Sequence, residues 1–253
     1  MSNVREDFTP MERAVRGHVL RIAHRGASAY APENSLQAFE KAAEMGADAV
    51  EIDIQITADD RPVVAHDENL QRVFGLNVTI GDVTLDQLGE MLPTDRAPIP
   101  TFEQVAAVCA DLKLGLYLDI KRLNMAAAGH IFDSLAATGL MAYTIFGSFR
   151  PDFLAELKAY SPAIRTSILF GSTHVQPVWL ARAVNADYVH PCWEHAAPEP
   201  HRLLTEAWLT AVRAANLGVV CWHEERPTEI AALSALGVDA ICSDTPDVLA
   251  RYS

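Results

Sequence analysis

The stretch VLRIAHRGASAYAPENSLQAFEKAAEMGADAVEIDIQ, residues 19–55, contains two apolar runs with a helical pattern between them. Residues 19–23 and 49–55 have the apolar, β-branched composition of buried strands. Residues 35–45 carry apolar side chains at helical spacing, and the pattern stops at a glycine. A strand, a helix and a second strand in this order form the repeating unit of an α/β fold.

The same alternation of strand and helix patterns continues along the rest of the chain. Further strands are predicted at residues 115–120, 143–147, 164–169, 188–190, 218–221 and 240–242. Further helices are predicted at residues 102–110, 125–137, 151–159, 177–184, 202–215, 228–235 and 245–251, after the first helix with its Asn34/Ser35 cap. Eight strands, each followed by a helix, in a chain of 253 residues predict an α/β fold of the (β/α)8 TIM-barrel type in a single domain. A doubly wound sheet is the alternative, but the Gly-rich phosphate loop that usually follows its first strand is absent here.

Two parts of the chain fall outside this alternation. Residues 62–67, PVVAHD, form an extra strand pattern that is expected to make a short hairpin with the second strand. Residues 68–100 are expected to be irregular, with one short helix near residues 84–91 and little room for a large inserted domain. Residues 1–18 are expected to form an N-terminal arm, so that the barrel domain comprises residues 19–253.

The composition argues against several classes of protein. Lys and Arg number 20 and Asp and Glu 33, which gives a formal charge of −13 and makes the chain a poor non-specific binder of nucleic acid. No window approaches about 20 uninterrupted apolar residues, and the first residues show no secretory signal, so no membrane span is expected. The four cysteines form no C-x-x-C pair and are expected to be free thiols in a reducing, cytoplasmic setting. An acidic enzyme acting on an anionic substrate would need a metal ion or a few placed cations.

Carboxylates gather at the predicted carboxyl ends of two strands, where barrel enzymes place their chemistry. Glu51 and Asp53 are two residues apart, so their side chains leave the same face of the second strand. Asp119, on the third strand of the alternation, would converge with them on the same mouth. Such a set is costly to bury without a cation, and three carboxylates suit Mg2+ or Ca2+, with Mn2+ as a further candidate. For the E-x-D pair alone, solvated residues paired with Lys or Arg are an equally good interpretation.

Two histidines and two cations complete the candidate site. His24 and His66 each follow an apolar strand and stand beside a charged residue. A single strand-end histidine is more often structural, but two of them near a carboxylate cluster can act as an acid and base pair in phosphoryl transfer. Arg25 and Lys121 supply the fixed positive charge that a phosphodiester needs, although Arg25 could instead be a plain salt-bridge partner of the acids.

At this point the sequence resembles the glycerophosphodiester phosphodiesterase family. The likeness extends from Leu20 to Leu249, and its ordered motifs are HRG at 24–26, PENS at 32–35, EID at 51–53, HD at 66–67, IPTF at 99–102, DIK at 119–121 and SD at 243–244. The ordered set of HRG, E-x-D and HD is specific, whereas any one of these motifs alone is weak. The resemblance implies a (β/α)8 barrel, a divalent metal ion, and hydrolysis of glycerophosphodiesters to glycerol 3-phosphate and an alcohol.

The resemblance also implies roles for individual residues. It makes Glu51 and Asp53 metal ligands, His24 and His66 the catalytic histidines, Arg25 a phosphate contact and Lys121 the substrate-side lysine. Asp119 stands where the family usually has a glutamate ligand, so its shorter side chain puts a direct contact with the metal in doubt. Cys221-Trp222-His223 stands where the family often reads W-T, so the alcohol pocket is expected to differ. Trp222 is a candidate to hold the apolar part of the leaving alcohol, and a choline group would gain about 0.5–2 kcal/mol from its ring.

Several mechanisms and functions remain open on the sequence alone. The free hydroxyl next to the phosphoester could attack phosphorus and give a cyclic phosphate that water then opens, or water could attack phosphorus directly. A phospholipase D-like or cyclising lyase of the sphingomyelinase D type, acting on lysophospholipids, is the nearest rival. Those enzymes carry disulfides and a signal segment that are not evident here. A non-catalytic barrel is a further alternative, and the presence of both histidines and three acids argues against it.

Overall fold

The structure is a computed structural model that describes residues 19–252. The N-terminal arm expected at residues 1–18 lies outside the described residues. Among the residues described, no helix combines the length and the apolar character that a membrane crossing requires. The four cysteines are free, as expected, and three of them are buried.

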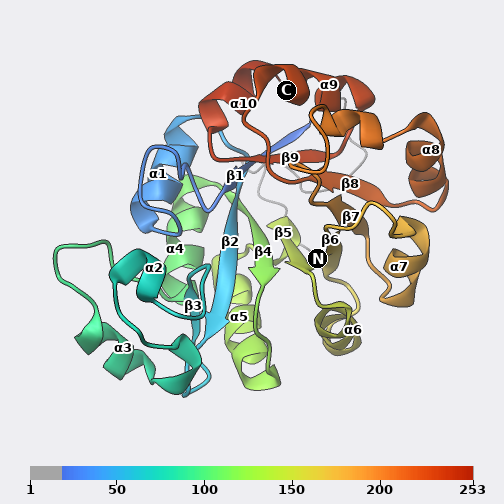
Figure 1. The fold of residues 1–253 in the computed structure, drawn as a ribbon. Helices are drawn as coiled ribbons and strands as arrows, with labels where there is room; N and C mark the ends of the chain where they lie inside the picture. The colour runs from blue at the N-terminus through green and yellow to red at the C-terminus, as the bar shows by residue number, and fades with distance from the viewer. Residues whose placement is uncertain (1–18, 253) are drawn as a thin grey trace.

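Eight parallel strands close into a barrel, which confirms the predicted fold (Figure 1). The strands are β1 (Leu20–His24), β2 (Ala49–Ile56), β4 (Gly115–Ile120), β5 (Thr144–Ser148), β6 (Arg165–Phe170), β7 (Tyr188–Pro191), β8 (Gly218–Cys221) and β9 (Ala240–Ser243). Strand β1 pairs with β2 on one side and with β9 on the other, and this double pairing closes the sheet. The carboxyl ends of all eight strands therefore lie at one mouth.

Helices surround the barrel in the order that the sequence predicts (Figure 1). They are α1 (Leu36–Glu44), α4 (Phe102–Leu112), α5 (Met125–Thr138), α6 (Pro151–Tyr160), α7 (Pro177–Ala183), α8 (Glu206–Ala214), α9 (Pro227–Leu236) and α10 (Pro246–Tyr252). The helix expected at 202–215 begins later, at Glu206, because the Thr205 side chain accepts a hydrogen bond from the backbone of Trp208 and caps it there. The residues before this cap form a separate turn, η3 (Pro200–Leu203). A second short turn, η2 (Met141–Tyr143), precedes β5.

The expected hairpin is present after the second barrel strand. Strand β3 (Pro62–Val64) pairs antiparallel with β2, and Val64 lies opposite Ile54. The segment that follows contains α2 (Gln71–Phe74), η1 (Ile80–Asp82) and α3 (Leu85–Met91), so the expectation of a single short helix was incomplete. These elements bury a small apolar cluster of their own against β3, made of Val63, Ala65, Leu70, Ile80 and Leu88. This cluster fixes the insertion beside the barrel mouth.

The interior of the barrel is filled by a polar aromatic layer below the mouth. Tyr117 lies two residues before Asp119 on β4, so the two side chains share a face and the Tyr117 ring lies one layer deeper. A Cβ atom at Gly147 of β5 would lie 2.6 Å from the Tyr117 ring, so only glycine leaves room for it. The Tyr117 hydroxyl lies 2.7 Å from Nδ1 of His190, which is at the end of β7 and 1% exposed. This layer is the floor of the mouth.

Candidate active site

The structure brings the three predicted acids together at the barrel mouth. Glu51 and Asp53 leave the same face of β2, and Asp119 lies opposite Asp53 in the parallel register of β4. Their exposed fractions are 2%, 0% and 1%, so all three are buried. One oxygen from each carboxylate lies within 4.8 Å of the others, a spacing that one cation can bridge.

Unpaired oxygens in this cluster fit a cation. Oε1 of Glu51 and Oδ1 of Asp119 are buried and have no hydrogen-bond partner among the described residues. A buried carboxylate oxygen without a partner destabilises the folded protein. One hard divalent ion can coordinate several such oxygens at once. The residues present therefore fit the metal ion that the resemblance implies.

The electrostatics of the three acids differ. Burial, reinforced by the neighbouring carboxylates, raises the pKa of Glu51 well above its ordinary value. Burial also raises the pKa of Asp119, to about 6, although Lys121 opposes the shift. At Asp53 burial acts in the same direction, but Lys121 and Arg25 outweigh it and hold the pKa below its ordinary value. Two of the three acids are therefore strained when charged, and added positive charge would relieve them.

Both predicted cations contact the acids directly. Lys121 Nζ lies 2.5 Å from Oδ2 of Asp119 and 3.0 Å from Oδ1 of Asp53. Arg25 Nε lies 3.2 Å from Oδ2 of Asp53, and the Arg25 backbone N–H donates to Oε2 of Glu51 at 3.0 Å. Arg25 is thus a partner of the acids in this structure.

The turn after β1 places Arg25 through a strained backbone. Arg25 has φ of 55° and Gly26 has φ of 80°, both in the left-handed region. A Cβ atom at Gly26 would lie 2.6 Å from Cβ of Ala38 on α1. The glycine of the HRG motif is therefore required by both its backbone angle and its close contact with the first helix.

Asn34 does not share the cap of the first helix, contrary to the sequence-based expectation. Ser35 alone caps α1 through its side chain, which accepts from the backbone N–H of Ala38. Asn34 has φ of 56°, and its Nδ2 donates to Oδ2 of Asp53 at 2.8 Å. The left-handed backbone turns the amide toward the mouth, so Asn34 is a site residue that sequence reasoning assigned to the helix.

His24 is buried at the end of β1 and has defined partners on both ring nitrogens. Its Nδ1 lies 2.6 Å from Oδ1 of Asp244, and its Nε2 accepts the indole N–H of Trp222 at 3.0 Å. Its ring also stacks on that of His223, with the centroids 4.7 Å apart. Burial lowers the pKa of His24, although the hydrogen bond to Asp244 opposes the shift. The indole N–H requires an acceptor, so the neutral ring carries its proton on Nδ1.

His66 follows β3, and its side chain is 34% exposed at the other side of the mouth. Its Nδ1 lies 2.7 Å from Oδ1 of Asp67, whose other oxygen lies 2.5 Å from Nε of Arg72. Arg72 also donates to both oxygens of Glu33, at 3.0 and 2.6 Å. Glu33 in turn accepts from Nη1 of Arg25 at 3.1 Å, which completes a chain of contacts between the two sides of the site.

A model of the Glycerophosphoryl diester phosphodiesterase family matches residues 24–248, the range that contains every candidate residue described above. The chain belongs to this family. A curated glycerophosphodiester phosphodiesterase from Caldanaerobacter subterraneus subsp. tengcongensis is 28% identical over 242 residues, which cover 91% of this chain and 96% of the relative. This assignment, together with the barrel, identifies the protein as a phosphodiesterase of the hydrolase class.

Solved structures of phosphodiesterases share this barrel. The glycerophosphodiester phosphodiesterase of Thermotoga maritima is 26% identical, with a TM-score of 0.75 and coverage of 93% of this chain and 99% of its own. An Oleispira antarctica phosphodiesterase, solved in complex with the product sn-glycerol-3-phosphate, is 23% identical, with a TM-score of 0.80 and coverage of 91% and 95%. In all these comparisons the likeness extends over nearly the whole chain.

In this family member, Trp222 lies among the catalytic candidates. Besides its bond to His24, its ring centroid lies 5.6 Å from Nζ of Lys121 and 5.5 Å from the ring of His190. The ring of Phe149, which is 45% exposed, lies 5.7 Å away. The ammonium group of Lys121 therefore lies within cation–π distance of the Trp222 ring.

Trp193, which follows β7, is 5% exposed. It packs against Phe170 and Trp208 between the barrel and its helices. This packing keeps the Trp193 side chain out of the site.

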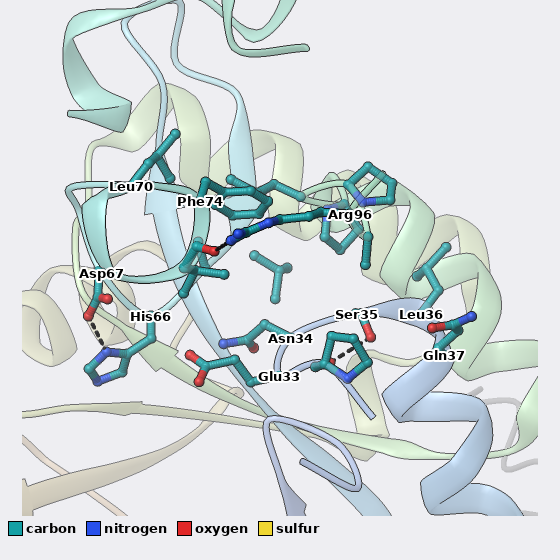
Figure 2. Close-up of a pocket in the computed structure, with 18 of the residues that line it drawn as sticks. Glu33, Asn34, Ser35, Leu36, Gln37, His66, Asp67, Leu70, Phe74 and Arg96 are labelled. Atoms are coloured by element: carbon teal, nitrogen blue, oxygen red, sulfur yellow. Dashed lines mark hydrogen bonds and ion pairs between the residues drawn. The ribbon is translucent and has the colours of Figure 1, made fainter. Parts of the chain in front are cut away.

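Two hollows border His66. The larger, of about 940 Å³, lies between residues 32–37 and the insertion after β3, and Arg96 crosses it with a hydrogen bond to the carbonyl of Val73 (Figure 2). The His66 ring is turned away from its centre, toward Asp67 (Figure 2). The smaller hollow, of about 620 Å³, is lined in part by His66 and Lys121 and therefore borders the candidate active site.

Proposed function

We propose that this protein hydrolyses glycerophosphodiesters to glycerol 3-phosphate and an alcohol with the help of one divalent cation. The observation that carries the proposal is the set of three buried carboxylates, with unpaired oxygens, flanked by His24 on one side and His66 on the other. The name of the Caldanaerobacter relative, a glycerophosphodiester phosphodiesterase, and the sn-glycerol-3-phosphate product in the Oleispira structure support the same substrate class.

Glu51, Asp53 and Asp119 would hold the cation, which is Mg2+, Ca2+ or Mn2+ in this proposal. When bound, such an ion supplies positive charge to the phosphoryl oxygens as negative charge develops on them. Arg25 and Lys121, already held at the acids, add fixed positive charge at the same place. Asn34 keeps the Asp53 carboxylate in position through the hydrogen bond described above.

His24 and His66 are proposed as the base and the acid. In both rings Nδ1 faces a carboxylate, that of Asp244 or Asp67, which leaves Nε2 to exchange a proton with the substrate. His24 is kept neutral by burial. Once the substrate displaces the Trp222 N–H from Nε2, His24 would accept the proton of the group that attacks phosphorus, either the free hydroxyl next to the phosphoester or water. His66 borders the open cleft and would protonate the departing alcohol. Trp222 would hold His24 and form a wall for the glycerol arm of the substrate.

The decisive experiment measures release of glycerol 3-phosphate from glycerophosphocholine and glycerophosphoglycerol, with phosphorus NMR to detect a cyclic product. Added Mg2+, Mn2+ or Ca2+ should support turnover, and excess EDTA should abolish it. Accumulation of a cyclic phosphate as the final product would favour the lyase alternative. Full turnover in excess chelator would remove the metal ion from the proposal, and no release with any of the three ions would refute it.

The location of the protein is a separate proposal. Four free thiols are typical of a reducing compartment, and the cytoplasm is the location that we propose.

A further inference from the structure

The smaller of the two hollows beside His66 is a cleft whose lining is entirely polar. It has a volume of about 620 Å³ and is lined by Gln55, His66, Asp67, Glu68, Asn69, Gln71, Arg72, Lys121 and Arg122. Every one of these side chains is polar or charged, and the only ring among them is the imidazole of His66. A ligand in this cleft would therefore be recognised by hydrogen bonds rather than by apolar or aromatic contact.

Gln55 gives the cleft a buried acceptor that lacks a partner. It continues the face of β2 that carries Glu51 and Asp53, and it is 3% exposed. Its Nε2 donates to the backbone carbonyl of His66 at 3.1 Å. Because a carbonyl can only accept, the amide nitrogen must face His66, and the amide oxygen is the remaining atom. That oxygen, Oε1, has almost no accessible surface and no hydrogen-bond partner among the described residues. A ligand hydroxyl reaches it by displacing a side chain that covers it, and the new hydrogen bond offsets that displacement.

The charges in the cleft are already compensated. Arg122 lies 3.0 Å from Glu68, and Arg72 is held by Asp67 and Glu33. An anionic ligand would have to compete with these carboxylates. A trimethylammonium group would find no ring of Phe, Tyr or Trp in the lining to receive it. A neutral ligand with several hydroxyl groups meets neither obstacle, because each hydroxyl can both donate and accept.

The larger hollow behind His66 does not compete for this role. Its lining includes apolar residues such as Leu70, Phe74 and Ile99, and the His66 ring is turned away from its centre (Figure 2). A group bonded to phosphorus near Lys121 and His66 would enter the smaller cleft first, since both residues line it.

We propose that this cleft binds the leaving alcohol and that Gln55 selects polyhydroxylated alcohols, such as glycerol or inositol, over choline. The amide oxygen of Gln55 accepts a hydrogen bond from a hydroxyl group of the alcohol, next to the histidine that protonates the departing oxygen. The inference rests on the proposed function and adds the class of leaving group to it.

The test compares four substrates: glycerophosphoglycerol, glycerophosphoinositol, glycerophosphocholine and glycerophosphoethanolamine. The wild-type protein should have a higher kcat/KM for the two polyol substrates than for glycerophosphocholine, the one headgroup of the four without a hydrogen-bond donor. Gln55→Met keeps the length of the side chain and removes the acceptor, so the polyol-to-choline ratio of kcat/KM should fall about tenfold. The loss should appear in KM, because the contact is made before and during the reaction alike. Gln176→Met is the matched control, because Gln176 is exposed and lines neither hollow beside His66, and it should leave the ratio unchanged.

The possible outcomes separate the explanations. A wild-type preference for choline, or no preference, would overturn the inference without any variant. An equal rise in KM for all four substrates would place the shared glycerol arm in the cleft and would also overturn it. A uniform fall in kcat would mean that Gln55 acts only by holding the His66 backbone. Absence of glycerol 3-phosphate from every wild-type reaction would instead refute the proposed function.

Discussion

The two histidines make the first test of the proposed chemistry at the scale of single residues. His24→Ala and His66→Ala should each lower kcat by roughly 10²-fold or more, the usual contribution of an acid or base. KM should change less, because the metal ligands, Arg25 and Lys121 remain in place. His174, which is exposed, provides the control substitution to alanine. Near wild-type turnover in either site variant would return that histidine to the structural interpretation.

Protons and the metal ion should compete for the same carboxylates. Burial raises the pKa of Glu51, and it raises that of Asp119 to about 6, so both acids hold protons more tightly than usual in the metal-free protein. A metal ion must displace these protons, and its affinity should therefore fall as the pH is lowered from 7.5 to 5.5. Calorimetric titration with Mg2+ or Mn2+ in buffers of different ionisation enthalpy measures both the affinity and the protons released. The same affinity at both pH values, without proton release, would contradict this reading.

At the scale of elements, the short helix α2 links two parts of the site that lie far apart in sequence. Arg72 of α2 contacts Asp67, the partner of His66, and Glu33, the partner of Arg25. Exposed ion pairs of this kind contribute little to stability, so their effect should be on geometry. Arg72 therefore positions both sides of the mouth without touching the reacting atoms itself.

Arg72→Met tests this link. Turnover should fall several-fold, whereas the free energy of unfolding should change by no more than about 1 kcal/mol, because the side chain is half exposed. Arg202→Met is a matched control, since Arg202 is also exposed and paired with a carboxylate, that of Glu199. A loss of stability without loss of turnover would make Arg72 a structural residue of the insertion.

The regular elements were predictable because their signals are local. Apolar runs and helical spacing gave all eight barrel strands and the surrounding helices to within a few residues. The insertion was not predicted in detail, because α2 and η1 comprise only 4 and 3 residues and are held by the apolar cluster around Leu70 and Ile80. Asn34 was misplaced for a related reason, since an Asn beside a helix start reads as a cap unless its left-handed backbone is known.

At the scale of the whole molecule, barrel closure creates contacts that no local pattern can show. His24 and Asp244 are 220 residues apart, and they meet because β1 pairs with β9, with Ala23 opposite Ser243. Trp222, which follows β8, reaches His24 across β9, the strand that lies between β8 and β1. The identities of the site residues were predictable from the motifs, but the partner that fixes each ring depends on which strands become neighbours.

The buried Asp119 carboxylate should lower the free energy of unfolding of the whole protein, and this effect can be measured. The pKa of Asp119 is raised in the folded state, so the folded protein binds more protons there than the unfolded chain, and stability is lost as the pH rises between the unfolded and folded pKa values. Asp119→Asn removes this cost, and without metal it should raise the free energy of unfolding at pH 7.5 by up to roughly 3 kcal/mol. Below about pH 4 the aspartate is protonated in both states, so the difference should disappear.

With saturating Mg2+ the order should reverse, because the wild-type protein gains binding energy that the variant lacks. Urea unfolding at pH 7.5 and at low pH in EDTA, and again with Mg2+, measures the difference in the free energy of unfolding under each condition. If the variant is less stable than wild type in EDTA at pH 7.5, the contact of Asp119 with Lys121 outweighs the burial of the charge.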